Sequence, residues 1–449
     1  MKKLRMHAVV GRMQAPSTST CVATLGAALL LVHLWRRRRP RFAFDGPLDR
    51  SGVHTVKHEL PVLMHGEAAV EALNMWVADM ELPCCDRIRG AIMDRAQHPT
   101  FGYTIQPREI WSRVGRWMVE RQGHPSAPDP SSFVFSASVV TSFWNVLEAC
   151  TAPGDRVLLM TPLYAPLQQA VSSSGRVLVP HALQLSQERG RYEIDLPRLE
   201  ADLQGVSLLL LCSPHNPSGT VWRRSELAAV ASACARRGVT LVADEIWADW
   251  PLPGAEPFVP CRAVVPADGG GPRLITLGAP TKSWSLAGLH ASFLVIEDDE
   301  LRQQYTRRAL PAFLAFGSTF ATTAMLAAYE HGAPWLDAAR AHVRANVDVL
   351  CSLLRAHVPE VVPLPPEATY LVWLDCSRLG LAPAALHDFL LRRAKLHLSA
   401  GEEFAPEAAQ FMRINVACSR PMLLEAVGRL RRAVETLREQ HLKRILDLD

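Results

Sequence analysis

The sequence lacks any CxxC pair, although ten cysteines are scattered between Cys21 and Cys418. Cysteine pairs at that spacing are typical of zinc ribbons, and regular cysteine patterns are typical of disulfide frameworks, so neither is predicted. We therefore expect no metal ion, and a reducing compartment is the simplest interpretation of the thiols. Cys84 and Cys85 are adjacent in the chain, and we expect them to pack rather than to act in redox chemistry.

The body of the chain also lacks a dense basic patch. The formal net charge is +4, but nine Lys and Arg and no Asp or Glu precede Asp45, which leaves 39 basic and 44 acidic residues in the rest. A slightly acidic body without interleaved basic and aromatic residues argues against nucleic acid as a partner. The hydrophobic content of 49% allows a large core, and a small-molecule ligand fits this composition better.

The N-terminal segment lacks acidic residues and a full membrane span. Its apolar run at residues 21–35 is fifteen residues long, short of the roughly 20 needed to cross a hydrocarbon core. With its basic flanks and Ser/Thr-rich lead-in, the segment at 1–44 resembles an organelle transit peptide, for a mitochondrion or plastid, or a signal-type leader. A membrane anchor and a disordered head on a cytoplasmic protein are the alternatives.

Short apolar runs alternate with helical patterns from residue 133 onward, which predicts an α/β fold with a mainly parallel sheet and helices on both faces. Several of these runs are continuously apolar, as expected of strands buried on both sides. Ser225 is predicted to cap a helix at residues 226–237, which Gly238 ends. The predicted strands are residues 156–160, 176–179, 207–212, 240–243, 273–277 and 292–296.

The pattern changes after about residue 320 to that of a smaller α+β domain, with helices at 335–356 and 383–394, strands at 369–374 and 412–416, and a final helix. The glycine-rich stretch at 260–272 lacks the Lys-Ser/Thr of a phosphate-binding P-loop, so it is expected to be a flexible surface loop. The predicted organisation is a leader at 1–44, an N-terminal arm joining the small domain at 45–98, a large domain at 99–320 and the small domain at 321–449.

Polar residues follow two of the predicted strands at their carboxyl ends, where functional groups gather in parallel sheets. In the stretch from Ser213 to Gly219 (SPHNPSG), two prolines and a glycine fix a tight turn that could present Asn216 to a bound ring. The next strand ends in Asp244-Glu245, and a buried carboxylate there needs a partner such as a protonated pyridine nitrogen. A plain turn and a helix-capping Asp are the alternatives.

Lysine is scarce, and Lys282 is the only Lys between Lys57 and Lys395. It follows the predicted strand at 273–277 in an apolar context of small residues, where a lowered pKa would let the amine form a Schiff base. An isolated surface Lys is commoner than a Schiff-base Lys, so Lys282 alone is a weak signal. The signal becomes specific through the order of groups at strand ends: Tyr164, the Asn-Pro-x-Gly turn, Asp-Glu and Thr-Lys.

In these residues the chain resembles the fold-type I pyridoxal 5′-phosphate (PLP) enzymes, the class I/II aminotransferase-like superfamily, from about Asp45 to the C-terminus. The branch it resembles most is that of the cystathionine β-lyases and cysteine-S-conjugate β-lyases. The matching stretches are WVADM at 76–80, FGYT at 101–104, CSPHNPSG at 212–219, DEI at 244–246, Lys282 with LAGL at 286–289, and RIN at 413–415.

The resemblance implies that residues 99–320 form the PLP-binding domain and that Lys282 holds PLP as a Schiff base. It implies that Asp244 pairs with the pyridine nitrogen, that Asn216 binds the phenolic oxygen, and that Tyr164 stacks on the ring.

It further implies a phosphate site made by Ser138 and Val139 at a helix start, by Thr281, and by Tyr103 of a neighbouring subunit, which would make a homodimer necessary. A helix N-terminus is a natural phosphate site. Arg413 is the implied clamp for the substrate carboxylate, because a guanidinium can bind it through two hydrogen bonds. Ala78 and Asp79 would lie beside the substrate.

Several positions depart from the family pattern. Trp247 follows Asp-Glu-Ile, where the lyase branch usually has His and aminotransferases have Tyr, and it belongs to the implied cofactor site as an indole donor that is neither acid nor base. The phosphate loop at 136–139 reads SASV in place of a Pro-Gly sequence. Glu81 replaces Asp, Thr281 and Ser283 replace Ser and Thr, and His290 stands near the position of an aminotransferase arginine.

The resemblance implies a PLP-dependent carbon–sulfur β-lyase that converts cystathionine or cysteine S-conjugates to a thiol, pyruvate and ammonia. A PLP-dependent aminotransferase of a small amino acid is the alternative, because the same residues serve both reactions. A non-catalytic relative that binds a partner is a third hypothesis. The joint presence of Lys282, Asp244, Asn216 and Arg413 argues against it.

Overall fold

The computed structural model describes residues 42–46, 48–266, 269–314 and 316–446. The chain divides into two units, Met1–Ala43 and Phe44–Asp449, and the second unit carries the fold. Most of the predicted leader at 1–44 lies outside the described residues. In the part that is described, no helix has both the length and the apolar character needed to cross a membrane.

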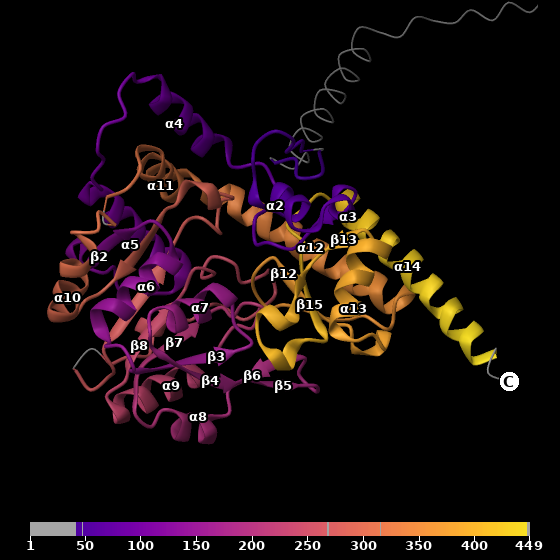
Figure 1. Ribbon diagram of the computed structural model, residues 1–449. Coiled ribbons are helices and arrows are strands. Elements are labelled where there is room, and N and C mark those ends of the chain that lie inside the picture. The colour runs from indigo at the N-terminus through magenta and orange to yellow at the C-terminus, as the bar shows by residue number, and fades with distance from the viewer. Residues whose placement is uncertain (1–41, 47, 267–268, 315, 447–449) are drawn as a thin grey trace, which may run out of the picture. The chain divides into compact units, whose positions relative to one another are not determined.

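The core of the fold is a seven-stranded, mainly parallel sheet, which confirms the predicted α/β class (Figure 1). Its order is β2-β10-β9-β8-β7-β3-β4, in which β10 is antiparallel to both β9 and β2 and the other pairs are parallel. The strands are β2 (Phe133–Ser136), β3 (Arg156–Thr161), β4 (Val177–Ala182), β7 (Val206–Cys212), β8 (Thr240–Asp244), β9 (Leu274–Gly278) and β10 (Ser292–Val295).

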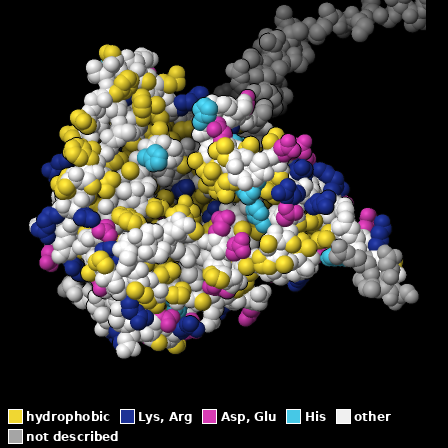
Figure 2. All heavy atoms as spheres, viewed as in Figure 1, with side chains coloured by type: hydrophobic (Ala, Val, Ile, Leu, Met, Phe, Trp, Pro, Cys, Tyr) yellow, Lys and Arg dark blue, Asp and Glu magenta, His cyan; other side chains and the backbone are white. Residues whose placement is uncertain are grey.

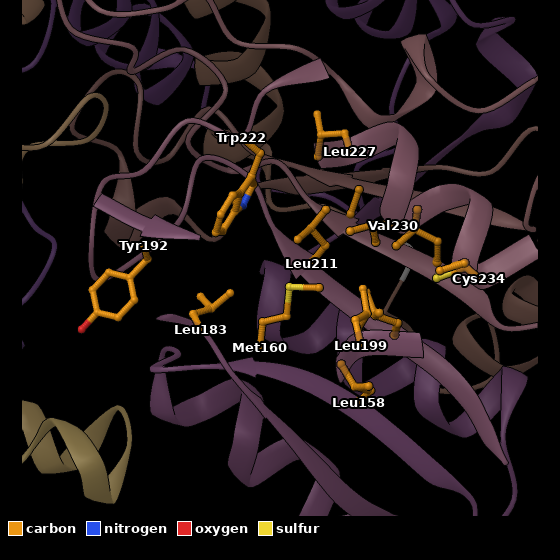
Figure 3. Close-up of a cluster of buried hydrophobic side chains, with 14 of the residues drawn as sticks. Leu158, Met160, Leu183, Tyr192, Leu199, Leu211, Trp222, Leu227, Val230 and Cys234 are labelled. Carbon is orange, nitrogen blue, oxygen red and sulfur yellow. The ribbon is translucent and has the colours of Figure 1, made fainter. Parts of the chain in front are cut away.

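Both faces of this sheet are covered by helices, which explains the continuous apolar runs. On one face, Leu158, Met160 and Leu211 pack against α8 (Leu196–Asp202) and α9 (Arg224–Arg237), as Figure 3 shows. The other face is covered by α6 (Val139–Cys150) and α7 (Ala165–Ser173).

A second, four-stranded sheet lies toward the C-terminus, with the order β11-β12-β15-β14. Its strands are all paired antiparallel, and α12 (Ala333–His357) packs against α14 (Arg420–Leu446) beside them. The strands are β11 (Val362–Leu364), β12 (Leu371–Asp375), β14 (Ser399–Ala400) and β15 (Phe411–Asn415). This is the predicted change of pattern, but the domain boundaries at 98/99 and 320/321 stay predictions.

The stretch at residues 56–74 joins this second sheet region through β1 (Leu73–Asn74), which pairs parallel with β13 (Leu396–His397). Two short helices, α2 (Val56–His65) and α3 (Glu67–Val70), precede β1. The remaining elements are α4 (Asp86–Gln97), α5 (Arg108–Gln122), the hairpin β5 (Gln184–Ser186) and β6 (Arg191–Glu193), α10 (Asp299–Ala309), α11 (Thr319–His331), and α13 (Pro383–Asp388) with the π-helical turn η5 (Phe389–Arg393).

The six strands predicted in the large sheet are confirmed, with shifts of at most three residues at their ends. The predicted capping by Ser225 is wrong, because α9 begins at Arg224 and the Glu226 carboxylate accepts the Arg223 backbone N–H at 2.7 Å instead. Gly238 ends the helix in the left-handed conformation, as predicted.

The stretch at 260–272 differs from a flexible loop at its start. Residues Cys261–Ala263 form a short 3₁₀ helix, in which Cys261 is buried, and Arg262 forms an ion pair with Glu297 at 2.6 Å. Residues 267–268 of this stretch lie outside the described residues. The expected loop is therefore anchored to the body at its first turn.

Candidate active site

A cavity of about 210 Å³ lies where the carboxyl ends of β7 and β8 meet the segment after β9. This is the edge at which parallel α/β sheets bind ligands. Ten of the twelve site residues predicted from the sequence line it: Ala78, Ser138, Val139, Tyr164, Asn216, Asp244, Trp247, Thr281, Lys282 and Arg413.

Lys282 lies four residues beyond the end of β9, in a tight turn, and its Nζ donates a hydrogen bond to the backbone oxygen of Ala78 at 2.8 Å. Burial lowers the pKa of this amine from 10.5 to about 8, against the opposing charges of Asp79 and Asp244. A substantial fraction of the amine is therefore neutral, and nucleophilic, near pH 8.

Asp244 is the last residue of β8 and is 4% exposed. Burial raises the pKa of its carboxyl to about 7, although the N–H of Ile246 donates to Oδ1 at 3.2 Å and the charge of Lys282 acts in the opposite direction. A carboxylate held this far from water gains most from a cationic partner placed beside it.

Glu245 points away from the cavity. Its Oε1 accepts the backbone N–H of Cys261 at 2.7 Å, and its Oε2 lies 3.8 Å from Nε2 of the buried His124. Burial raises the pKa of Glu245 to about 8. Of the two carboxylates in the Asp-Glu pair, only Asp244 lines the cavity.

The turn after β7 places Asn216 against the second sheet. Gly219 has a φ of +70°, and a Cβ there would lie 2.6 Å from the Ala368 backbone oxygen, so the turn requires glycine. The Gly219 carbonyl accepts N–H groups of Glu367 and Ala368 at 3.0 and 2.8 Å. This close approach joins the Asn216 turn to the segment that leads into β12.

Arg413 lies in β15 and is 3% exposed. It donates to Asn216 Oδ1 at 2.9 Å, to the Trp76 backbone oxygen at 3.0 Å and to Ser399 Oγ at 3.1 Å. Burial lowers its pKa to about 10, so the group stays charged at neutral pH. Its hydrogen bonds within the described residues all go to neutral oxygens, which leaves the positive charge available for an anionic ligand.

Ser138 is the N-cap of α6, and its Oγ accepts the N–H of Thr141 at 3.1 Å. Val139 and Val140, the first residues of the helix, line the cavity beside it. The N–H groups of a first helical turn have no partner within the helix and attract anions. Thr281 adds a hydroxyl to the same cavity.

Two aromatic side chains line the cavity. Tyr164 is the N-cap of α7 and is 37% exposed, and burial raises the pKa of its phenol. Trp247 is 1% exposed and packs edge-on against Tyr370, with ring centroids 4.8 Å apart.

Comparison with known proteins identifies the family. The model for class I and II aminotransferases matches residues 73–430. The chain belongs to this family. Cystathionine beta-lyase PatB of Bacillus subtilis is 35% identical over 393 residues, 87% of this chain and 99% of that protein. Protein MalY of Escherichia coli is 30% identical over 404 residues, 88% of this chain and 100% of that protein.

Solved structures are also similar to this chain. Cystalysin from Treponema denticola, whose structure contains PLP, matches with a TM-score of 0.83 and 27% identity over 88% of this chain and 99% of that one. The PLP-bound C-S lyase of Staphylococcus hominis matches with a TM-score of 0.80 and 26% identity over 88% of this chain and 98% of that one.

Two predicted site residues do not line the cavity of this aminotransferase-family chain. The Asp79 carboxylate forms an ion pair with Arg50 at 2.6 Å and affects Lys282 through its charge alone. Tyr103 is 95% exposed, which is compatible with its predicted contribution to a neighbouring subunit. The roles of both residues stay predictions.

Sequence reasoning missed residues that hold the site in place. Tyr370 donates to the Ala78 backbone oxygen at 3.1 Å, so this carbonyl accepts from both Tyr370 and Lys282. Asp249 accepts the Ser283 hydroxyl at 2.5 Å next to Lys282. Asn415 was part of a matching motif, and its amide donates to the backbone oxygens of Val77 and Asp79, both at 2.8 Å.

No single-sequence signal marks Tyr370 or Asp249, because their partners lie 292 and 34 residues away in the chain. Alternation of polar residues along the predicted strand at 412–416 could have indicated that Arg413 and Asn415 share one face.

Proposed function

We propose that this chain is a PLP-dependent carbon–sulfur β-lyase that cleaves cystathionine or cysteine S-conjugates to a thiol, pyruvate and ammonia. The observation that carries the proposal is the convergence of Lys282, Asp244 and Arg413 on one cavity. It is supported by relatives named as cystathionine β-lyase that align over most of the chain.

The donor set of the cavity fits PLP group by group. The buried Asp244 carboxylate suits a protonated pyridine nitrogen, because burial disfavours its negative charge and raises its pKa to about 7, and a cation beside it would stabilise that charge. Ser138, the first turn of α6 and Thr281 suit the phosphate. The amide of Asn216 suits the phenolic oxygen, and Tyr164 supplies an aromatic face for the ring.

Lys282 would hold the cofactor and then act on the substrate. When bound, PLP accepts the electron pair left by removal of the substrate Cα proton. The Lys282 amine would be the base that takes up this proton, and its lowered pKa of about 8 leaves a substantial fraction of the amine unprotonated near pH 8. Asp244 would keep the ring nitrogen protonated.

Arg413 would orient the substrate through its α-carboxylate. Its guanidinium is fixed by Trp76, Ser399 and Asn216, so a carboxylate meets a charge that needs little reorganisation. A β-substituent that leaves as a thiolate requires little acid assistance, because thiols have a pKa of roughly 8 to 9. Carbon–sulfur bond cleavage therefore suits a cavity in which Lys282 is the main proton carrier.

The proposed assembly is a homodimer in which Tyr103 enters the neighbouring site. Tyr103 lies in an exposed segment with Phe101 and Ile105, which are 60% and 73% exposed. Phe313 and Phe316 are also exposed, and the two segments are joined by a bridge between Thr104 and Gly317. An apolar surface of this kind is typical of a protein interface, and a second copy would cover it.

The test is to incubate holoenzyme with L-cystathionine, with and without an added 2-oxo acid. The proposal predicts equal amounts of pyruvate and thiol in both cases, because elimination needs no amino-group acceptor. A keto acid that appears only with the acceptor would instead identify an aminotransferase and overturn the proposal.

A further inference from the structure

Three histidines from separate elements meet outside the lining of the substrate cavity. His65 ends α2, His387 lies in α13 and His397 ends β13, and their ligand atoms all lie within 4.8 Å of one another. In Figure 2, histidine side chains gather on the visible surface over the region of β13 and α13.

The three rings contact one another, with centroids 5.4, 5.5 and 6.2 Å apart, and their nitrogens are close enough together to share a metal ion. Zn–N bonds of about 2.1 Å place two ligand nitrogens of a tetrahedral site about 3.4 Å apart, and the ligand atoms of the three histidines lie within 4.8 Å of one another. His65 and His387 are partly exposed, so an ion has a path to the buried His397.

A second interaction prepares His397 as a ligand. Its Nδ1 lies 3.2 Å from the Oδ1 of Asn74 on the paired strand β1, and both residues are buried. When Nδ1 donates this hydrogen bond, the tautomer is fixed and the Nε2 lone pair is left for an ion, which is the usual support of a metal-binding histidine.

We propose that His65, His387 and His397 bind one divalent transition-metal ion of the zinc class. Three imidazoles suit zinc, copper and nickel better than magnesium or calcium, which prefer oxygen ligands. Water completes the coordination.

The bound ion would fasten α2 to α13 and β13, near the substrate pocket. His65 belongs to α2, whereas His387 and His397 lie between β12 and β14 of the second sheet in the chain. The ring of His397 lies 5.2 Å from that of Trp76, whose backbone oxygen accepts a hydrogen bond from Arg413. The ion would therefore hold His397 beside Trp76, the residue whose backbone oxygen supports the proposed carboxylate clamp.

Binding is tested with full-length, untagged holoenzyme that has been stripped with a chelator and titrated with Zn²⁺ against a chromophoric competitor. One tight site per chain is expected. His387→Gln and His397→Ala should each weaken it more than about 100-fold, and Asn74→Ala should weaken it about 10-fold to 100-fold. His441→Ala, on the exposed end of α14, is the matched control and should bind as the wild type does.

Visible absorption after Co²⁺ substitution reports the ligand set independently of affinity. A tetrahedral Co²⁺ spectrum is expected for the wild type and the His441→Ala variant, and not for the His65→Ala/His387→Gln/His397→Ala triple variant. Circular dichroism and PLP absorbance establish that the variants are folded. Equal Zn²⁺ binding by the wild type and the triple variant, or no tight site in the wild type, would overturn the proposal.

Discussion

Lys282 and Asp244 bring opposite formal charges into one cavity, and burial shifts the pKa of each toward its neutral form. The pKa of the Lys282 amine falls to about 8, and the pKa of the Asp244 carboxyl rises to about 7. Each group is therefore costly to hold charged in the cofactor-free chain. A ligand with a pyridinium on one side and an electrophilic carbonyl on the other would relieve both costs.

Replacing the buried carboxylate should stabilise the cofactor-free protein at high pH. The folded-state pKa of Asp244 lies above its ordinary 3.8, so the folded protein binds more protons than the unfolded one and loses stability as pH rises between these values. Asp244→Asn should be up to about 4 kcal/mol more stable than the wild type at about pH 8 and equal to it near pH 4.

Chemical denaturation of the cofactor-free proteins across this pH range measures the difference. Asp94→Asn, at an exposed position in α4, is the control and should show no such trend. A constant stability difference at all pH values would contradict the burial argument.

At the residue scale, the sequence was sufficient to predict site residues of a rare type or at the end of a strand. Lys282 stood out because lysine is scarce around it, and Asp244 because it ends an apolar run. Tyr370, Ser399 and Asp249 could not be predicted, since their roles depend on backbone oxygens and side chains that only the folded chain brings near.

The N-terminus of α6 is the element on which phosphate binding would depend. Ser138 caps this helix, and the first turn opens into the cavity. Ser138→Ala should cost about 1 kcal/mol of stability through the lost cap. It should also weaken PLP binding, because a hydroxyl donor at the phosphate is lost.

A second N-cap separates these two effects. Asp195 caps α8 by accepting the N–H of Arg198 at 3.1 Å, on the opposite face of the sheet. Asp195→Ala should lose comparable stability and keep the wild-type dissociation constant for PLP, measured by absorbance titration. An equal loss of PLP affinity in both variants would contradict a role of the α6 N-terminus in binding the phosphate.

At the element scale, the prediction of strands succeeded because strands buried on both faces are continuous apolar runs bounded by breakers. The predicted helix at 383–394 is divided into α13 and the π-helical turn η5, a local change of hydrogen bonding that side-chain periodicity does not reveal. The start of α9 was predicted two residues too late, because Ser225 suits an N-cap but lies within the first turn of the helix.

In the whole molecule, the cavity is assembled from segments that span residues 77 to 413. The second sheet supplies Arg413 and holds the 76–79 segment through Asn415, while the large sheet supplies the groups that would bind the cofactor. The sequence could name these groups by resemblance, but the contacts between the sheets depend on close approaches such as that of Gly219 to Ala368.

The proposed dimer predicts complementation between two inactive chains. Co-expressed Tyr103→Ala and Lys282→Ala chains form hybrid dimers in which one site contains both defects and the other contains neither. Random pairing should therefore restore about a quarter of the wild-type activity.

The matched control is the wild-type chain co-expressed with a Tyr103→Ala/Lys282→Ala double variant. Each hybrid dimer then has one site without Lys282 and one site without the partner's Tyr103 side chain, so hybrids should add no activity. The wild-type homodimers, about a quarter of the dimers, should alone give about a quarter of the wild-type activity, as in the first mixture. No activity in the first mixture and about half of the wild-type activity in the second would contradict a shared site, and sedimentation analysis would establish whether hybrids form.

The central claim is tested most directly by anaerobic incubation of the purified protein with PLP and L-cystathionine, measuring pyruvate and free thiol together. Lys443→Ala, at an exposed position in α14, serves as the lysine control for Lys282→Ala. We expect pyruvate and thiol in a one-to-one ratio from the wild type and the control, and neither product from Lys282→Ala. Product formation by Lys282→Ala at the wild-type rate, or PLP binding by the wild type without either product, would contradict the account.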